Sequence, residues 1–166
     1  MAINVRDEDI PLKLRYVYQV ATRSDDRNTK NGVILVNKEW TVLSACNHMM
    51  AGYGDKDWHH ERPFKYLVTE HAERAALYEA ARKGIKTQGL TLVSNWVACP
   101  DCARGIVLAG IACVITHKQC QDKTPARWKE QVEMGLDIIR KDCDLVVWDG
   151  KVDKVDNLKN GEIWYP

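Results

Sequence analysis

Long apolar segments are missing from this 166-residue chain, and so is a large charge of one sign. No apolar run approaches the roughly 20 residues that a membrane-spanning helix needs. The formal net charge of +1 gives no electrostatic basis for binding a polynucleotide or a membrane surface. The N-terminal residues Met1–Pro11 carry charges from Arg6 to Asp9 and lack the apolar core of a secretory signal. We therefore expect a cytoplasmic protein that has no membrane or polynucleotide partner.

A disulfide framework is not needed either, because a chain of this length can bury a sizeable core without cross-links. Four of the six cysteines lack the spacing of metal ligands. Cys46, Cys113 and Cys143 lie in or beside apolar stretches and are expected to be small buried hydrophobic residues. Cys120 lies in a polar stretch and is expected to be an exposed thiol. Only the pair Cys99 and Cys102 has a spacing that suggests chemistry.

Apolar periodicity and turn residues predict strands that alternate with helices in one domain, residues 1–166. Strands are expected at residues 32–36, 40–46, 90–97, 111–116 and 145–148, the first two forming a hairpin. Helices are expected at residues 11–21, 69–83, 100–109 and 125–141, with Thr69 capping the second of them and Gly84 ending it. Residues 47–63 form a long loop, and the chain from about residue 150 is a polar, weakly patterned tail. This order predicts a layered α/β fold with a largely buried sheet.

Two short motifs carry the chemistry: His71-Ala72-Glu73 and, after one helix and one strand, Cys99-Pro100-Asp101-Cys102. Each motif alone is modest evidence, because His-x-Glu can simply start a surface helix and Cys-x-x-Cys can be a redox pair or half of a zinc ribbon. The second Cys-x-x-Cys that a four-cysteine ribbon needs is absent. Together, His71, Cys99 and Cys102 lie at two predicted helix starts, where the helix dipole favours thiolate. Three ligands leave one tetrahedral position for water, as in catalytic zinc sites.

Glu73 is expected to act beside the metal rather than on it. Residues two apart on a helix do not face the same way, so Glu73 cannot share the direction of His71. Its carboxylate is then placed next to the open coordination position, where a general acid/base belongs. A bound Zn²⁺ lowers the pKa of its water, and Glu73 takes the proton. Because Glu73 is not needed to hold metal, its presence favours catalysis over a purely structural zinc module.

These residues resemble the cytidine/deoxycytidylate deaminase superfamily, for which His-x-Glu with Pro-Cys-x-x-Cys is the signature. Within it the chain is most similar to deoxycytidylate (dCMP) deaminases. The resemblance covers roughly Leu12 to Val147 and is carried by residues 24–32, 71–73, 91–92, 99–103 and 109–115. It implies a three-layer α-β-α fold with a central mixed sheet of about five strands, Zn²⁺ as cofactor, and a homo-oligomer, either dimer or hexamer. It also implies hydrolysis of the amine of dCMP, or of a 5-substituted dCMP, to a uracil-type nucleotide and ammonia.

The resemblance further assigns substrate contacts. Asn47, after the second predicted strand, holds the position that touches the sugar, although His48 follows it where the family usually has Gly. Ala72, inside the first motif, is assigned to the substrate as well. Trp96 is either a stacking wall for the base or an ordinary core residue. Val97-Ala98 stands where guanine, tRNA-adenosine and riboflavin-pathway deaminases usually carry Glu-Pro, and this favours a pyrimidine.

Other charged residues and other functions stay open. Arg62 or Arg74 could meet a substrate phosphate or lie on the surface. His59 and His60 are expected in a solvated loop rather than at a second zinc site, and His117 is expected to be structural. The alternatives to a nucleotide deaminase are a deaminase of cytidine, guanine or adenosine, a non-catalytic zinc-binding module, and a thiol redox protein built on Cys99 and Cys102.

Overall fold

The computed structural model describes residues 5–38 and 40–166, and its centre is a five-stranded sheet in the order β2-β1-β5-β6-β7. The strands are β1 (Gly32–Val36), β2 (Thr41–Cys46), β5 (Thr91–Ser94), β6 (Cys113–His117) and β7 (Asp144–Trp148). Strand β1 runs antiparallel to β2 and β5, whereas β5, β6 and β7 are parallel. The sheet is therefore mixed, which confirms the predicted fold class.

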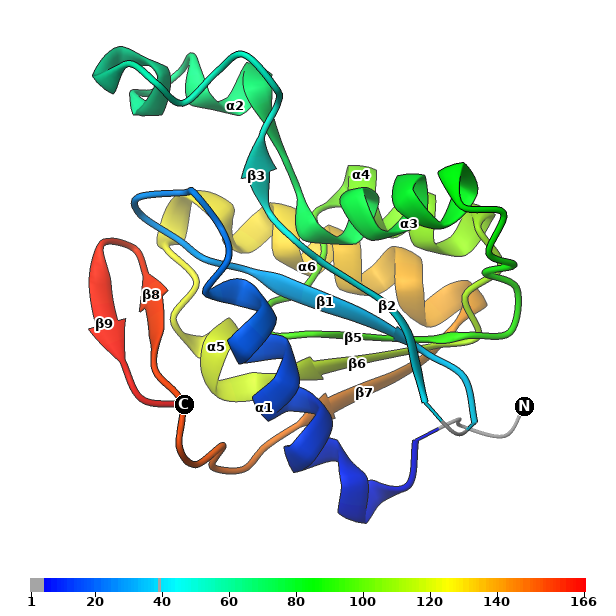
Figure 1. The fold of residues 1–166 in the computed structure, drawn as a ribbon. Helices are drawn as coiled ribbons and strands as arrows, with labels where there is room; N and C mark the ends of the chain where they lie inside the picture. The colour runs from blue at the N-terminus through cyan, green and yellow to red at the C-terminus, as the bar shows by residue number, and fades with distance from the viewer. Residues whose placement is uncertain (1–4, 39) are drawn as a thin grey trace.

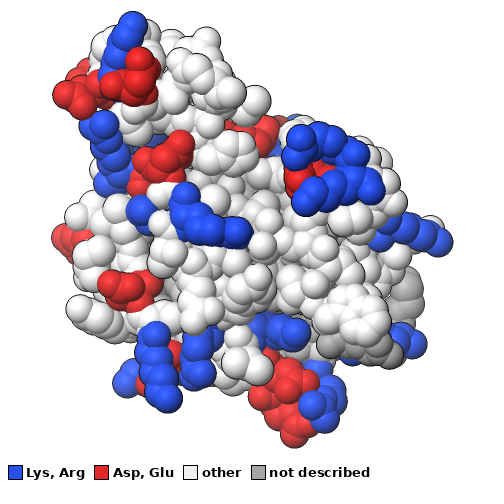
Figure 2. Space-filling view, in the orientation of Figure 1, with Lys and Arg blue, Asp and Glu red and all other residues white. Residues whose placement is uncertain are grey.

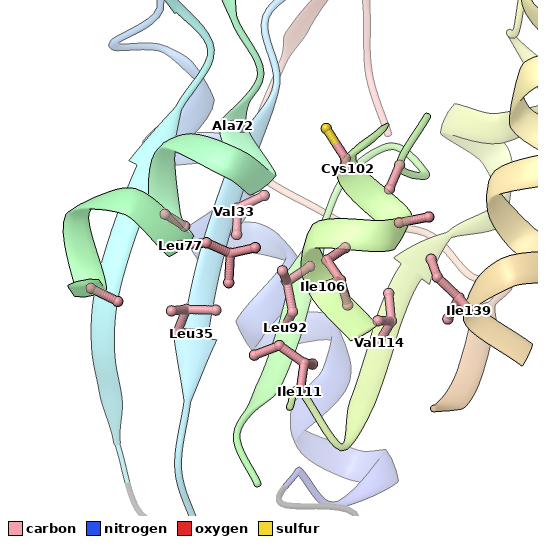
Figure 3. Packing of buried hydrophobic residues seen from close by; sticks show 14 of the residues in the cluster. Val33, Leu35, Ala72, Leu77, Leu92, Cys102, Ile106, Ile111, Val114 and Ile139 are labelled. Atoms are coloured by element: carbon pink, nitrogen blue, oxygen red, sulfur yellow. The ribbon is translucent and has the colours of Figure 1, made fainter. Parts of the chain in front are cut away.

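Helices cover both faces of this sheet (Figure 1). Helix α1 (Ile10–Ala21) lies on one face, and α3 (Ala72–Arg82), α4 (Pro100–Leu108) and α6 (Ala126–Asp142) lie on the other. Side chains of a strand alternate between faces, so Val33 and Leu35 pack with α3 and α4 while Ile34 and Val36 pack with α1. Figure 3 shows the first of these two clusters, with Cys102 at its upper edge. Burial on both faces explains why β1 is a continuous apolar run.

Helix α3 begins later than the sequence predicts. Residues 69–70 form the short strand β4 (Thr69–Glu70), which pairs with β3 (His48–Met49), and the helix begins at Ala72 with His71 as its N-cap. The predicted cap at Thr69 is therefore wrong, because its backbone is used in pairing with Met49. The predicted end is confirmed, since Gly84 follows the helix with a positive φ of 67°.

The long loop projects from the body of the molecule (Figure 1). It contains the 3₁₀ turn η2 (Asp57–His60), and the short helix α2 (Lys65–Val68) follows it. His59 is buried, and its Nδ1 accepts a hydrogen bond of 3.0 Å from the Gly54 N–H. The prediction of a solvated loop is wrong for His59, which forms the interior of the loop itself. Among the described residues, no second group of metal-ligand type is found there.

The C-terminal segment is more ordered than its composition suggests. It forms a hairpin of the strands β8 (Asn157–Lys159) and β9 (Glu162–Trp164). The two remaining elements are the 3₁₀ turn η1 (Asp7–Asp9), which precedes α1, and the short helix α5 (Lys118–Asp122), which follows β6. The sequence did not predict this hairpin. Strands of three residues are too short to show a period of two in the sequence, so nothing in the local pattern indicated them.

Two predictions about single residues have opposite outcomes. Cys120 is fully buried, because α5 turns its side chain inward although its neighbours in sequence are polar. The prediction that Cys120 is an exposed thiol is therefore wrong. His117 is structural as expected: its Nδ1 lies 2.7 Å from the Tyr18 hydroxyl and its Nε2 lies 2.8 Å from the Gly150 carbonyl oxygen.

On the face of the molecule shown in Figure 2, basic and acidic side chains are interspersed, and no large patch of one charge sign is seen. Within residues 5–38 and 40–166, none of the helices is both long and apolar enough to cross a membrane.

Candidate active site

The predicted metal ligands meet at the starts of two helices. His71 is the N-cap of α3, Cys99 is the N-cap of α4, and Cys102 lies in the first turn of α4. His71 Nδ1 lies 3.5 Å from the Sγ of Cys99 and 3.5 Å from that of Cys102, and the three ligand atoms lie within 4.8 Å of one another. Tetrahedral zinc with bonds of about 2.0 Å to nitrogen and 2.3 Å to sulfur separates the two kinds of donor by about 3.5 Å. The donor set therefore fits zinc in both chemistry and spacing.

The electrostatics of the triad favour a bound cation. A hydrogen bond from Cys102 lowers the pKa of the Cys99 thiol to about 4, and His71 acts in the same direction. The same hydrogen bond raises the pKa of Cys102, which keeps the shared proton. The pKa of His71 is raised, first by its hydrogen bond to Cys99. The lowered pKa of Cys99 favours its thiolate form, and the helix N-termini add partial positive charge that stabilises a thiolate.

Glu73 lies in the first turn of α3 and is 7% exposed. It lines the same pocket as His71 and Cys99 but does not belong to the ligand group. Burial raises the pKa of its carboxyl group above the ordinary range for a glutamate. A raised pKa makes this carboxylate a better proton acceptor than an ordinary glutamate, as a general acid/base requires.

A pocket of about 270 Å³ opens over these residues. Trp96 and Asn47 also line it, whereas the Ala72 side chain packs into the core of the fold. Ala72 is fully buried and is not among the residues that line the pocket, and its predicted contact with substrate stays a prediction. The pocket is small enough to enclose a single planar ring with a few attached groups.

Asn47 has a role within the fold that the sequence did not indicate. Its side chain is 5% exposed, its Oδ1 accepts a hydrogen bond from the Asn31 N–H at 2.8 Å, and its Nδ2 donates to the Thr29 carbonyl oxygen at 2.9 Å. The amide thus holds the backbone of residues 29–31, part of which lines the pocket.

One flank of the pocket is basic and aromatic. Arg62 and Arg127 line it and stand beside the rings of Tyr66 and Trp128, at 5.9 and 6.0 Å. Neither guanidinium forms an ion pair or hydrogen bond with any residue of the described ranges. Arg74 also lines the pocket, but it is held by Glu70 at 2.7 Å. Of the two arginines that the sequence singled out, Arg62 is therefore the freer one.

A family profile described as the cytidine and deoxycytidylate deaminase zinc-binding region matches residues 8–118. A deaminase encoded in the luxG 3′ region of Aliivibrio fischeri, described as uncharacterized, is 30% identical over 129 residues, which cover 78% of this chain and 85% of that protein. The chain belongs to the cytidine and deoxycytidylate deaminase family. The resemblance predicted from the two motifs is thereby confirmed.

Solved structures share the fold of this deaminase family member. The dCMP deaminase of cyanophage S-TIM5 superposes with a TM-score of 0.65 at 19% identity, over 87% of this chain and all of that one. The bifunctional diaminohydroxyphosphoribosylaminopyrimidine deaminase and reductase of Thermotoga maritima gives 0.62 at 18% identity, over 86% of this chain and 36% of that one. The guanine deaminase of Nitrosomonas europaea superposes with a TM-score of 0.51 at 10% identity, over 89% of this chain and 87% of that one. These likenesses establish the fold and leave the substrate open.

Several residues of this deaminase pocket carry no sequence motif. Arg127, Trp128 and Asn160 lie beyond the family match at residues 8–118, and no local pattern marks them. Asp26 and Lys65 are paired at 2.9 Å, and both side chains are 7% exposed. In the sequence, only Asp26 is marked, because it lies in residues 24–32, one of the stretches that carry the family resemblance.

Helix α6 of this deaminase is pressed against the segment that leads into Cys99. A Cβ added at Gly135 would lie 2.0 Å from the Ala98 carbonyl oxygen and 3.3 Å from the Cys99 carbonyl carbon. The helix can approach this closely only because residue 135 has no side chain.

Gly135→Ala is therefore expected to destabilise the protein by about 1–3 kcal/mol, despite the better helix propensity of alanine. The displaced backbone before Cys99 should also weaken zinc binding. Gly105→Ala in α4 is the control, because its Cβ would meet only Leu77 Cδ1 at 3.5 Å. Thermal unfolding and zinc competition with a chelator measure both effects. Equal behaviour of the two variants would contradict the close packing of α6.

Proposed function

We propose that this protein is a zinc-dependent hydrolytic deaminase of a pyrimidine nucleotide, dCMP or a 5-substituted dCMP, which yields the uracil-type nucleotide and ammonia. The observation that carries the proposal is one pocket lined by His71 and Cys99 of the metal-ligand triad, by the buried Glu73 and by a flank with two guanidinium groups that form no ion pair among the described residues. The metal-ligand residues and Glu73 would supply the hydrolytic chemistry, and the guanidinium groups of the flank would bind a phosphate.

His71, Cys99 and Cys102 would hold the zinc ion. When bound, zinc supplies a Lewis acid that lowers the pKa of a water molecule. Glu73 accepts the proton of the attacking water, and the oxygen adds to the ring carbon that bears the amine. Glu73 passes this proton to the ring nitrogen. It then takes the second proton from the hydroxyl group added to the ring carbon and passes it to the amine, which leaves as ammonia while the carbonyl forms and Glu73 returns to its starting state. Its buried position excludes bulk water and keeps the proton on the reaction path.

We assign Trp96 to the base and Asn47 to the sugar. Trp96 lines the pocket, and an indole is suited to stacking on a planar base. Asn47 uses Oδ1 and one N–H in the fold, so one amide hydrogen is left for a sugar hydroxyl.

Arg62 and Arg127 are placed for the phosphate. Lys65 also lines the pocket, but its ammonium is paired with Asp26 and Arg74 is paired with Glu70. The two remaining guanidinium groups match the geometry of phosphate oxygens. A structure of the cyanophage dCMP deaminase in complex with dCMP and dUMP has the same fold, which supports a nucleotide here. Self-association, implied by the family resemblance, stays a prediction.

The test is ammonia release from dCMP, 5-methyl-dCMP, deoxycytidine, dCTP, cytosine, guanine and adenosine. We expect dCMP or its 5-methyl derivative to give the highest kcat/KM. The double variant Arg62→Gln/Arg127→Gln should raise KM for dCMP at least about tenfold and leave deoxycytidine unchanged. Arg140→Gln, an exposed residue of α6 away from the pocket, is the matched control. Preferred turnover of guanine, adenosine or the free nucleoside would contradict the proposal.

A further inference from the structure

Lys159 is a buried cation. Its side chain is 3% exposed, and its Nζ has no nitrogen or oxygen hydrogen-bond partner among the residues that the structure describes, although the Cys120 thiol is close enough to act on it. No ion pair of the described chain includes it either. Removing an ammonium group from water without pairing it is costly, so some other interaction must offset the loss of hydration.

That interaction is with Trp96. The Nζ of Lys159 lies 3.0 Å from the centroid of the Trp96 ring. Trp96 lines the candidate active site, whereas Lys159 is not among the residues that line it. A cation held over an indole in a desolvated site is among the stronger contacts of this kind. A second contact, from Trp96 Nε1 to Thr124 Oγ1 at 2.9 Å, fixes the edge of the same ring.

The hairpin that carries Lys159 is tied to the pocket at further points. The Lys30 N–H donates to the Leu158 carbonyl oxygen at 2.9 Å, and the Gly161 N–H donates to that of Asn28 at 2.8 Å. The Asn160 N–H donates to Thr29 Oγ1 at 3.1 Å. Asn28, Thr29 and Asn160 all line the pocket. In Figure 1 the β8–β9 hairpin lies beside the loop that precedes β1. The hairpin is therefore part of the wall, although it lies outside the family match at residues 8–118.

We propose that the C-terminal hairpin determines substrate selection, with Lys159 as a positioning residue that holds Trp96 as the base-facing wall of the pocket. This inference rests on the proposed function. The charge over the indole also opposes a second cation at the ring, because both would compete for the same π density. The wall is thus suited to a neutral planar heterocycle, such as an unprotonated cytosine, and not to a cationic ring.

The surroundings keep Lys159 charged near neutral pH. Burial lowers its pKa to about 8, while the Cys120 thiol of α5 and the carboxylate of Glu73 on α3 act in the opposite direction. A pKa of about 8 lies above neutral pH, so most molecules carry the ammonium there.

The test replaces Lys159 by methionine, which has a similar length and no charge. We expect KM for the pyrimidine nucleotide to rise by about 5- to 30-fold with kcat changed by less than about twofold. The melting temperature should stay equal or rise, since a desolvated charge is removed. A higher KM without a lower melting temperature would show that Lys159 positions Trp96 for the substrate. A merely structural role for Lys159 would instead lower the melting temperature. Lys151→Met, which removes an exposed lysine paired only with Asp153, should leave KM unchanged.

A cycle with Trp96→Leu decides whether Lys159 acts through Trp96. The double variant Lys159→Met/Trp96→Leu should have the KM of Trp96→Leu alone, because the cation has no aromatic ring left to position. An unchanged KM in Lys159→Met, or effects of the two substitutions that add fully, would overturn the proposal. Lys159→Gln serves the same comparisons if the methionine variant does not fold.

A spectroscopic readout keeps this inference separate from the proposed function. Removing the ammonium next to the indole should change the tryptophan emission, and this change should vanish in the Trp96→Leu background. If the wild-type protein deaminates no pyrimidine nucleotide, the proposed function fails while the emission difference still tests the contact. If the emission difference persists without Trp96, the contact itself is wrong.

Discussion

Glu73→Gln is expected to reduce kcat by about 100- to 10,000-fold while the protein keeps one zinc ion per chain. Glutamine has nearly the same shape but cannot take a proton from water, so the variant loses positioned acid/base catalysis. The metal should remain, because Glu73 lies outside the group formed by His71, Cys99 and Cys102. The melting temperature should not fall, since the variant removes a carboxyl group whose burial raises its pKa.

The measurement combines ammonia release with zinc content by mass spectrometry on the same samples. Glu79→Gln is the matched control on the same helix, because within the described part of the chain Glu79 forms ion pairs only with Arg82 and Lys83. It should keep full activity. A Glu73→Gln variant that retains more than about a tenth of the wild-type rate would show that another group moves the proton. A variant that loses its zinc would show that Glu73 is a ligand.

Cys99→Ser is expected to abolish both zinc binding and deamination. Serine offers a poor ligand in place of a thiolate, and the loss leaves only two of the three donors. Metal that binds the native state alone stabilises it by about 4 kcal/mol when its concentration is 1,000 times the dissociation constant. We therefore expect the zinc-loaded wild type to melt at a higher temperature than the metal-free wild type, and Cys99→Ser to show no such difference.

Cys143→Ser is the control for this prediction, because Cys143 is a half-buried thiol away from the triad that donates to the Ile111 carbonyl oxygen at 3.1 Å. It should bind zinc and turn over substrate as the wild type does. Restoration of activity to chelated wild type by one equivalent of zinc completes the test. Activity that survives full removal of zinc would exclude the metal mechanism and favour a thiol function for Cys99 and Cys102.

The sequence predicted well wherever a property depends on neighbours along the chain. The strand at residues 32–36 has the predicted bounds, because a continuous apolar run is typical of a strand covered on both faces. His71 and Cys99 lie at helix starts as expected, since the apolar period begins just after each motif. Predictions failed where the partner of a residue is far away in sequence. Thr69 pairs with Met49 instead of capping a helix, and Cys120 is covered by distant elements.

The sequence by itself determined the family, the layered fold and the group of residues proposed for zinc and proton transfer. These follow from short spacings, because side chains three residues apart in one helical turn share a face. Only the tertiary structure decided the rest of the pocket. Arg127 comes from α6, Arg62 from the projecting loop and Lys159 from the C-terminal hairpin, and none of the three lies in a motif. Their proximity depends on how separate elements pack, and no local pattern encodes it.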